Sequence, residues 1–99
     1  MTEPNAYFFC NRRTRTYGCY TNLQIIDETG LPAIHMGYSK IRTLAGDLKK
    51  VGITKGREGP YGIVCGLPDS DSIFDGDGGR KNFRPATDRE LEELLEHLG

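Results

Sequence analysis

The sequence predicts a single α+β domain in the order β-β-β-α-β-α, with a four-stranded mixed sheet covered by two helices. Three observations lead to this prediction. Two β-type runs flank a basic turn near the N-terminus, two later segments have the apolar spacing of amphipathic helices, and a short apolar run between them suits one strand. A chain of 99 residues is too short for two independent cores, so one domain over residues 1–99 is expected.

The first element is a β-hairpin over residues 6–27, the segment AYFFCNRRTRTYGCYTNLQIID. Mirror pairing around Thr14 and Arg15 gives a short turn and places Cys10 opposite Cys19. The residues on one face are then small or apolar, and this face is expected to line the core: Ala6, Phe8, Cys10, Cys19, Thr21, Leu23 and Ile25. The opposite face carries the aromatic residues Tyr7, Phe9 and Tyr20 close to the basic turn.

A turn of sequence DETG precedes a third strand over residues 31–37, which completes an antiparallel meander. A helix over residues 40–51 follows, because its apolar residues recur at helical spacing. Gly52 ends this helix, and Ile53 is expected to pack back on its last turn. Glycine in a helix costs about 1 kcal/mol relative to alanine, so Gly46 indicates a close approach to a neighbouring element.

The apolar run at 61–67 predicts a buried strand, central in the sheet, parallel to the third strand and beside the first. Residues 68–79 form an acidic loop that is expected to be mobile, and a basic segment follows at 80–85. In the final helix, Thr87 and Glu90 have the spacing of a capping box. Its apolar stripe consists of Leu91, Leu94, Leu95 and Leu98.

The net charge of −1 hides a strong segregation along the chain. Residues 1–57 contain nine Lys and Arg against four Asp and Glu, whereas residues 58–99 contain four against ten. One surface is therefore expected to attract anionic partners if the fold keeps the two halves apart. With no signal peptide, no long apolar run and three widely spaced cysteines, the expectation is a soluble, cytoplasmic protein.

No complete catalytic, metal or cofactor motif is present, so no catalytic residue, metal or cofactor is predicted. The acidic loop offers carboxylates, but their spacing is not that of an EF-hand. Ile73 and Phe74 in this loop either fold back as an anchor or contact a partner, and folding back is favoured. Cys10 and Cys19 are either a redox-sensitive pair or two buried apolar residues, and burial is favoured.

These features favour a non-enzymatic binding module that acts as an inhibitor, adaptor or accessory regulator of a protein or protein–nucleic-acid complex. The expected binding residues come from the hairpin, the basic loop at 54–60 and the acidic loop: Arg12, Arg13, Arg15, Tyr7, Phe9, Tyr20, Lys55, Arg57 and Phe74. An alternative is a nucleic-acid-binding module in which the arginines hold phosphates and the aromatic rings stack on bases. Because the isoelectric point is not basic, a protein or ribonucleoprotein is preferred to free nucleic acid, and no membrane is expected.

A third possibility rests on Gly18-Cys19-Tyr20 and His35-Met36-Gly37, followed by a helix, a strand and an acidic helix. This layout resembles the GIY-YIG nucleases over residues 17–97. The resemblance implies metal-dependent phosphodiester cleavage by two tyrosines, a helix arginine and a glutamate metal ligand. Tyr20 matches the first tyrosine, His35 replaces the second, and Arg42 lies a turn early for the arginine. The candidates for the metal ligand are Glu90, Glu92 and Glu93.

Overall fold

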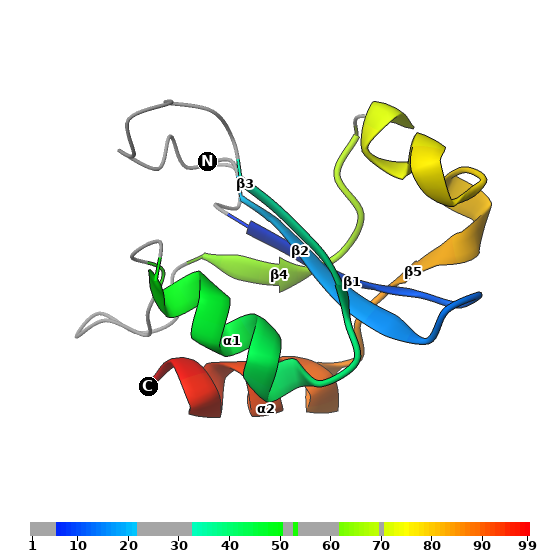
Figure 1. Cartoon of the computed structure of the whole chain (residues 1–99). Helices are drawn as coiled ribbons and strands as arrows, with labels where there is room; N and C mark the ends of the chain where they lie inside the picture. The colour runs from blue at the N-terminus through cyan, green and yellow to red at the C-terminus, as the bar shows by residue number, and fades with distance from the viewer. Residues whose placement is uncertain (1–5, 22–32, 51–52, 54–61, 70) are drawn as a thin grey trace.

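The computed structural model describes residues 6–21, 33–50, 53, 62–69 and 71–99. Five strands, two α-helices and two 3-10 helices occur in this part of the chain. In order they are β1 (Ala6–Asn11), β2 (Thr16–Thr21), β3 (Ala33–Tyr38), α1 (Ile41–Lys50), β4 (Ile63–Cys65), η1 (Asp71–Asp77), η2 (Arg80–Asn82), β5 (Phe83–Pro85) and α2 (Asp88–Leu98). The predicted α+β class is confirmed, and both α-helices lie on the same face of a mixed sheet (Figure 1).

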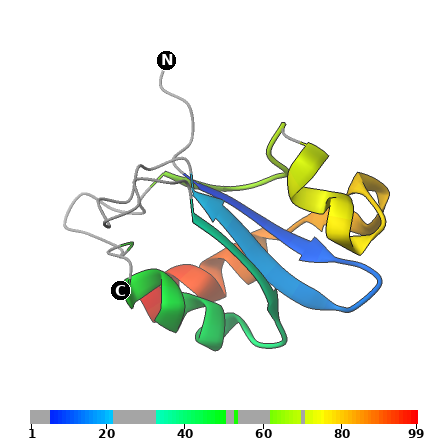
Figure 2. The same cartoon turned by 45° about the horizontal axis from the view of Figure 1, so that its top comes forward.

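The sheet is built around β1. Its strand order is β3-β2-β1-β4, and β5 also pairs with β1. Because β2 occupies one edge of β1, the two short strands share the other edge: β4 runs parallel to residues 6–8, and β5 runs antiparallel to residues 9–11 (Figure 2). The fourth strand therefore lies beside the first, as predicted. It is not central, however, because it has three residues, ends the order and leaves Val64 exposed.

The register of the first hairpin differs from the predicted register by two residues. Cys10 lies opposite Tyr17, and Cys19 lies opposite Phe8, so the two cysteines do not face each other. The turn is longer than expected because residues 12–15 all stand outside the strands, with Arg15 in the left-handed region at φ 57°. A shift of two residues leaves the faces unchanged, so both cysteines are still buried on the core face.

The main core fills the space between the sheet and the α-helices. Phe8 of β1 packs there with Leu44 and Leu48 of α1 and with Leu94 and Leu98 of α2, all almost completely buried. The last turn of α1 is closed by a backbone hydrogen bond from Ile53 to Leu48, with an N to O distance of 2.9 Å. Ile53 is also buried in this core, as the sequence predicted.

Gly46 does not mark a close approach. A Cβ atom built at this position meets no atom within 4 Å, and the residue is exposed on the outer surface of α1. The glycine therefore lowers helix propensity without any packing benefit among the described residues.

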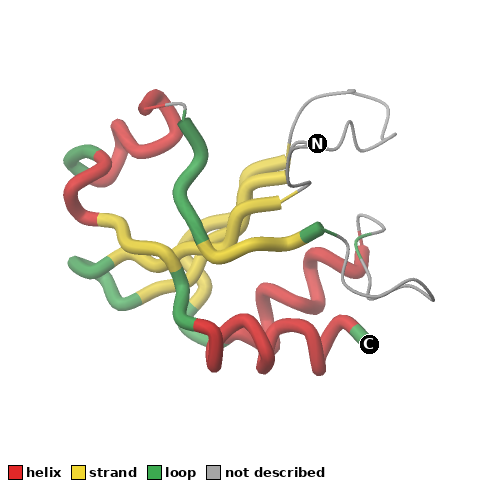
Figure 3. Tube along the Cα trace, turned by 180° about the vertical axis from the view of Figure 1, so that it is seen from behind, coloured by secondary structure: helices red, strands yellow, loops and turns green. Residues whose placement is uncertain are grey.

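A second, smaller core covers the opposite face of the sheet. The segment from η1 to β5 folds over β1, and Figure 3 shows it on the side away from the two α-helices. Phe74 of η1 and Phe83 of β5 each pack against Phe9 of β1 with ring centroids 5.7 Å apart, and the Phe74 and Phe83 rings lie 4.5 Å from each other. Residues 71–77, expected in a loop, thus form a helix anchored by Phe74, which folds back as predicted. Strand β5 was not predicted.

Several sequence predictions fall outside the described residues. These are the end of the hairpin at 22–27, the turn and the start of the third strand at 27–32, Gly52, and the basic loop with Lys55 and Arg57. Within the described part of the chain, no helix is long and apolar enough to cross a membrane.

Candidate binding site at the hairpin end

The turn between β1 and β2 brings three exposed arginines to one end of the sheet: Arg12, Arg13 and Arg15. The fold adds cations that are distant in sequence. The Arg12 amide donates a hydrogen bond to the Asn82 carbonyl at 2.6 Å, and β5 places Arg84 opposite Cys10. We call the resulting surface the basic end, and it consists of Arg12, Arg13, Arg15, Lys81 and Arg84.

Asn11 fixes the shape of this turn. Its side-chain oxygen accepts hydrogen bonds from the amides of Arg13 and Thr14 at 2.9 and 3.2 Å, while its carbonyl accepts one from the Arg15 amide at 2.8 Å. Asn and Asp favour turns because their side chains can replace backbone acceptors in this way. The Asn11 side chain is buried, so the arginines are presented from a rigid base.

A cavity of about 370 Å³ lies beside the turn, on the sheet face that carries the α-helices. Its lining includes Arg12, Arg15 and Arg84, together with Tyr17 and Cys10. Arg84 is held in place, because one guanidinium nitrogen donates to Glu90 at 3.1 Å and to the Pro85 carbonyl at 3.0 Å. Three guanidinium groups around one cavity favour an oxyanion such as a carboxylate or a phosphate.

Glu90 organises the wall of this cavity. Its carboxylate accepts hydrogen bonds from the Thr87 amide at 2.9 Å, from Arg84, and from the Tyr17 hydroxyl. Partial burial raises the pKa of Glu90, but the hydrogen bonds from the Thr87 backbone, Arg84 and Tyr17 outweigh burial and lower this pKa to about 2. The predicted capping box of Thr87 and Glu90 is confirmed, and the same carboxylate also ties α2 to two strands.

The nucleophilic side chains beside the cavity are held in their protonated forms. Burial, together with the Glu90 carboxylate, raises the pKa of the Tyr17 phenol and of the Cys10 thiol to about 12 each. Burial alone raises the pKa of Cys19 to about 12. At neutral pH these groups are therefore protonated and poor nucleophiles.

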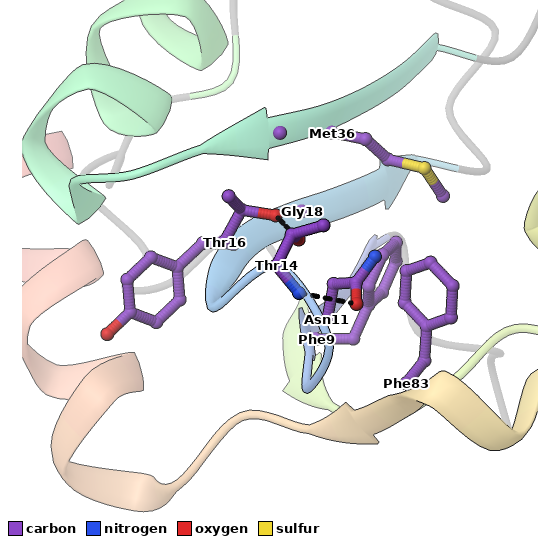
Figure 4. A pocket seen from close by; sticks show the side chains of 9 residues that line it. Phe9, Asn11, Thr14, Thr16, Gly18, Met36 and Phe83 are labelled. Carbon is purple, nitrogen blue, oxygen red and sulfur yellow. Dashed lines mark hydrogen bonds between the residues drawn. The ribbon is translucent and has the colours of Figure 1, made fainter. Parts of the chain in front are cut away.

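A second pocket lies behind the same turn, on the opposite face of the sheet (Figure 4). It encloses about 230 Å³. The hairpin supplies most of its lining, and β3 and β5 complete it: Phe9, Asn11, Thr14, Thr16, Tyr17, Gly18, Met36, Gly37 and Phe83. Gly18 is required for this shape, because a Cβ atom there would lie 2.6 Å from Cε1 of the Phe9 ring.

The structure separates the predicted binding residues into two groups. The three arginines lie together at the turn, whereas Phe9 and Phe74 have no exposed surface and pack against each other in the second core. Tyr7 and Tyr20 are half-buried against the same core. The aromatic face therefore packs in part beneath η1 and β5, and Tyr7 and Tyr20 keep only part of their surface exposed.

The structure brings together only part of the set that the nuclease resemblance implies. Arg42 of α1 and Glu93 of α2 line one cavity of about 430 Å³ with Tyr17 and His97. His35 lies opposite Cys19 and so shares the face of the α-helices, whereas Tyr20 packs on the other face. Burial lowers the pKa of His35, and its buried Nε2 atom has no hydrogen-bond partner within the part of the chain that the structure describes. Arg42 is exposed on α1, and Glu90 is engaged with Arg84 and Tyr17. Glu92 and Glu93 are exposed on α2.

Among the described residues, no group of three or more His, Cys, Asp or Glu side chains is positioned to hold a metal ion. No family model matches this sequence, and comparisons with curated proteins and with solved structures find no significant match. The arguments for function therefore rest on the geometry and charge of the basic end.

Proposed function

We propose that this protein is a small non-enzymatic binding module that uses the basic end to hold an anionic surface of a macromolecular partner. A module of this kind would act as an inhibitor, adaptor or accessory regulator. The observation that carries the proposal is the meeting of two basic segments, at 12–15 and 80–84, around one cavity. Strand pairing holds both segments rigidly, so little entropy is lost when a partner binds.

The chemistry of the cavity supports recognition of oxyanions. Arg12 and Arg15 are exposed at its edge, and their guanidinium groups match carboxylate or phosphate geometry. Arg84 is already oriented by Glu90, which leaves its charge partly compensated and its position fixed. The protonated Tyr17 and Cys10 favour binding over nucleophilic catalysis.

The test is an affinity pull-down from host lysate, with and without nuclease treatment, using the wild type and the variant R12A/R13A/R15A. The variant should keep nearly the same thermal stability, because exposed charges contribute little to folding. It should lose the partners that the wild type captures. The matched control is K49A/K50A/R89A, which removes three exposed cations from α1 and α2 and should capture the same partners as the wild type.

Equal partner recovery by the wild type and by R12A/R13A/R15A would refute the proposal. Equal loss in both triple variants would mean that net charge alone, and not the basic end, controls binding.

A further inference from the structure

The pocket behind the turn has the size of a single side chain. Its volume of about 230 Å³ lies below the range of about 300 to 1,000 Å³ that is typical of small-molecule and cofactor sites. An aromatic ring fits the groups that line it. The rings of Phe9 and Phe83 already meet edge to face, with an interplanar angle of 76°, and Met36 brings a thioether to the opposite wall (Figure 4). Both ring edges and thioethers make favourable contacts with aromatic rings.

The polar groups of the pocket argue against a nucleobase. The Asn11 side-chain oxygen already accepts hydrogen bonds from two backbone amides, and the hydroxyls of Thr14 and Thr16 share a hydrogen bond of 2.7 Å. A base carries several donors and acceptors on its edges, whereas the Asn11 oxygen and the hydroxyl pair of the pocket are already engaged within the protein. Burying polar groups without partners costs free energy, so an apolar ring is the better occupant.

The charges around the pocket specify what carries this ring. Thr14, on the pocket wall, is the neighbour of Arg13 and Arg15, and Asn11 is the neighbour of Arg12. Although Arg12 and Arg15 line the cavity on the other face, a ring that enters the pocket brings its flanking residues close to the turn that carries the three exposed arginines. Carboxylates on those flanking residues would be complementary to the basic end.

We infer that the pocket behind the turn holds an aromatic side chain within an acidic segment of the partner protein. This inference rests on the proposed function, which assigns the basic end to an anionic partner, and it adds the pocket as the element that distinguishes one acidic segment from another. The ring is the buried anchor of the interface, and the arginines form its charged rim.

The experiment is an NMR titration of the isotope-labelled protein with three synthetic peptides: acetyl-Asp-Glu-Phe-Glu-Asp-amide, the same peptide with Ala in place of Phe, and a neutral peptide with Asn and Gln in place of the acids. The acidic Phe peptide should shift the Met36 methyl and Gly18 amide signals. It should bind at least about fivefold more tightly than either of the other peptides.

Two substitutions on β3 provide a matched comparison. Met36→Ala removes the thioether and should weaken binding of the acidic Phe peptide by about fivefold while leaving the Ala peptide unaffected. Ile34→Ala is made two residues away on the same strand face, where the side chain is 50% exposed and does not line the pocket, and should change binding by less than about twofold. Met36→Leu keeps the side-chain volume and should bind nearly as well as the wild type.

Three outcomes would overturn the inference while leaving the proposed function intact. These are equal binding of the Phe and Ala peptides, no response at Met36 to any peptide, and a Met36 response to single-stranded oligothymidylate in place of the acidic Phe peptide. The last outcome would assign the pocket to a nucleobase. Failure of the proposed function is recognised separately, because R12A/R13A/R15A would then retain the lysate partners.

Discussion

A single carboxylate, that of Glu90, connects three elements of this fold. It caps the first turn of α2, forms an ion pair with Arg84 of β5 and accepts a hydrogen bond from Tyr17 of β2. The Cys10 thiol of β1 lies 3.7 Å from one of its oxygens. The charged form of Glu90 therefore contributes both to the stability of the protein and to the position of Arg84 in the candidate site.

We expect Glu90→Gln to destabilise the protein by about 3 kcal/mol at neutral pH, the free energy that corresponds to a pKa lowered from 4.5 to about 2. Because the pKa is lower in the folded state, this contribution is complete above about pH 4.5 and is lost as the pH falls through about 2. Urea denaturation at neutral pH and at about pH 3 measures it. The difference in the free energy of unfolding between wild type and variant should become smaller at acidic pH. A difference that does not depend on pH would contradict the role given to the Glu90 charge.

The N-terminal cap of α2 and the contact of Ile53 with the last turn of α1 were predicted correctly because their signals are local. The capping box of Thr87 and Glu90 and the packing of Ile53 on the last turn of α1 depend on residues a few positions apart. Strand β5 and helix η1 depend instead on Phe74 and Phe83 meeting Phe9, and contacts so distant in sequence leave no periodic pattern. The candidate site was therefore predicted only in part. Its arginines were named, but Arg84, Glu90 and the pocket depend on the pairing of β5 with β1.

Two glycines within elements are expected to respond to alanine in opposite directions. Gly46→Ala adds a methyl group in open space and should stabilise α1 by about 0.5 to 1 kcal/mol. Gly18→Ala would place its methyl group 2.6 Å from the Phe9 ring and 3.0 Å from the His35 carbonyl, and should destabilise the protein by about 1 to 3 kcal/mol. Thermal denaturation of both variants measures the effects, and a stabilised Gly18→Ala would contradict the packing described for Phe9.

At the scale of the whole molecule, the sheet is covered on both faces by different kinds of structure. The α-helices bury one face in the larger, mainly aliphatic core around Phe8, and the segment from η1 to β5 buries part of the other face through three phenylalanines. This arrangement explains why Phe9 is not available as a surface and why Tyr7 and Tyr20 are only partly exposed. It also explains how the basic segment after η1 comes to lie against the hairpin turn, since η2 and β5 continue directly from the residues that cover Phe9.

Because the two cores lie on opposite faces of the sheet, a substitution in one core should affect stability and partner binding differently from a substitution in the other. Leu94→Ala in α2 should cost about 2 to 5 kcal/mol, and more than Leu95→Ala, because Leu94 is completely buried and Leu95 only partly. Phe74→Ala should cost about 3 to 5 kcal/mol, and it should also weaken partner binding among the molecules that remain folded, since η1 supports β5 and Arg84. Denaturation curves give the stabilities, and pull-down at a temperature where each variant is folded gives the binding. If Phe74→Ala bound the partner as well as an equally stable Leu94→Ala, the 3-10 segment would not be needed to assemble the basic end.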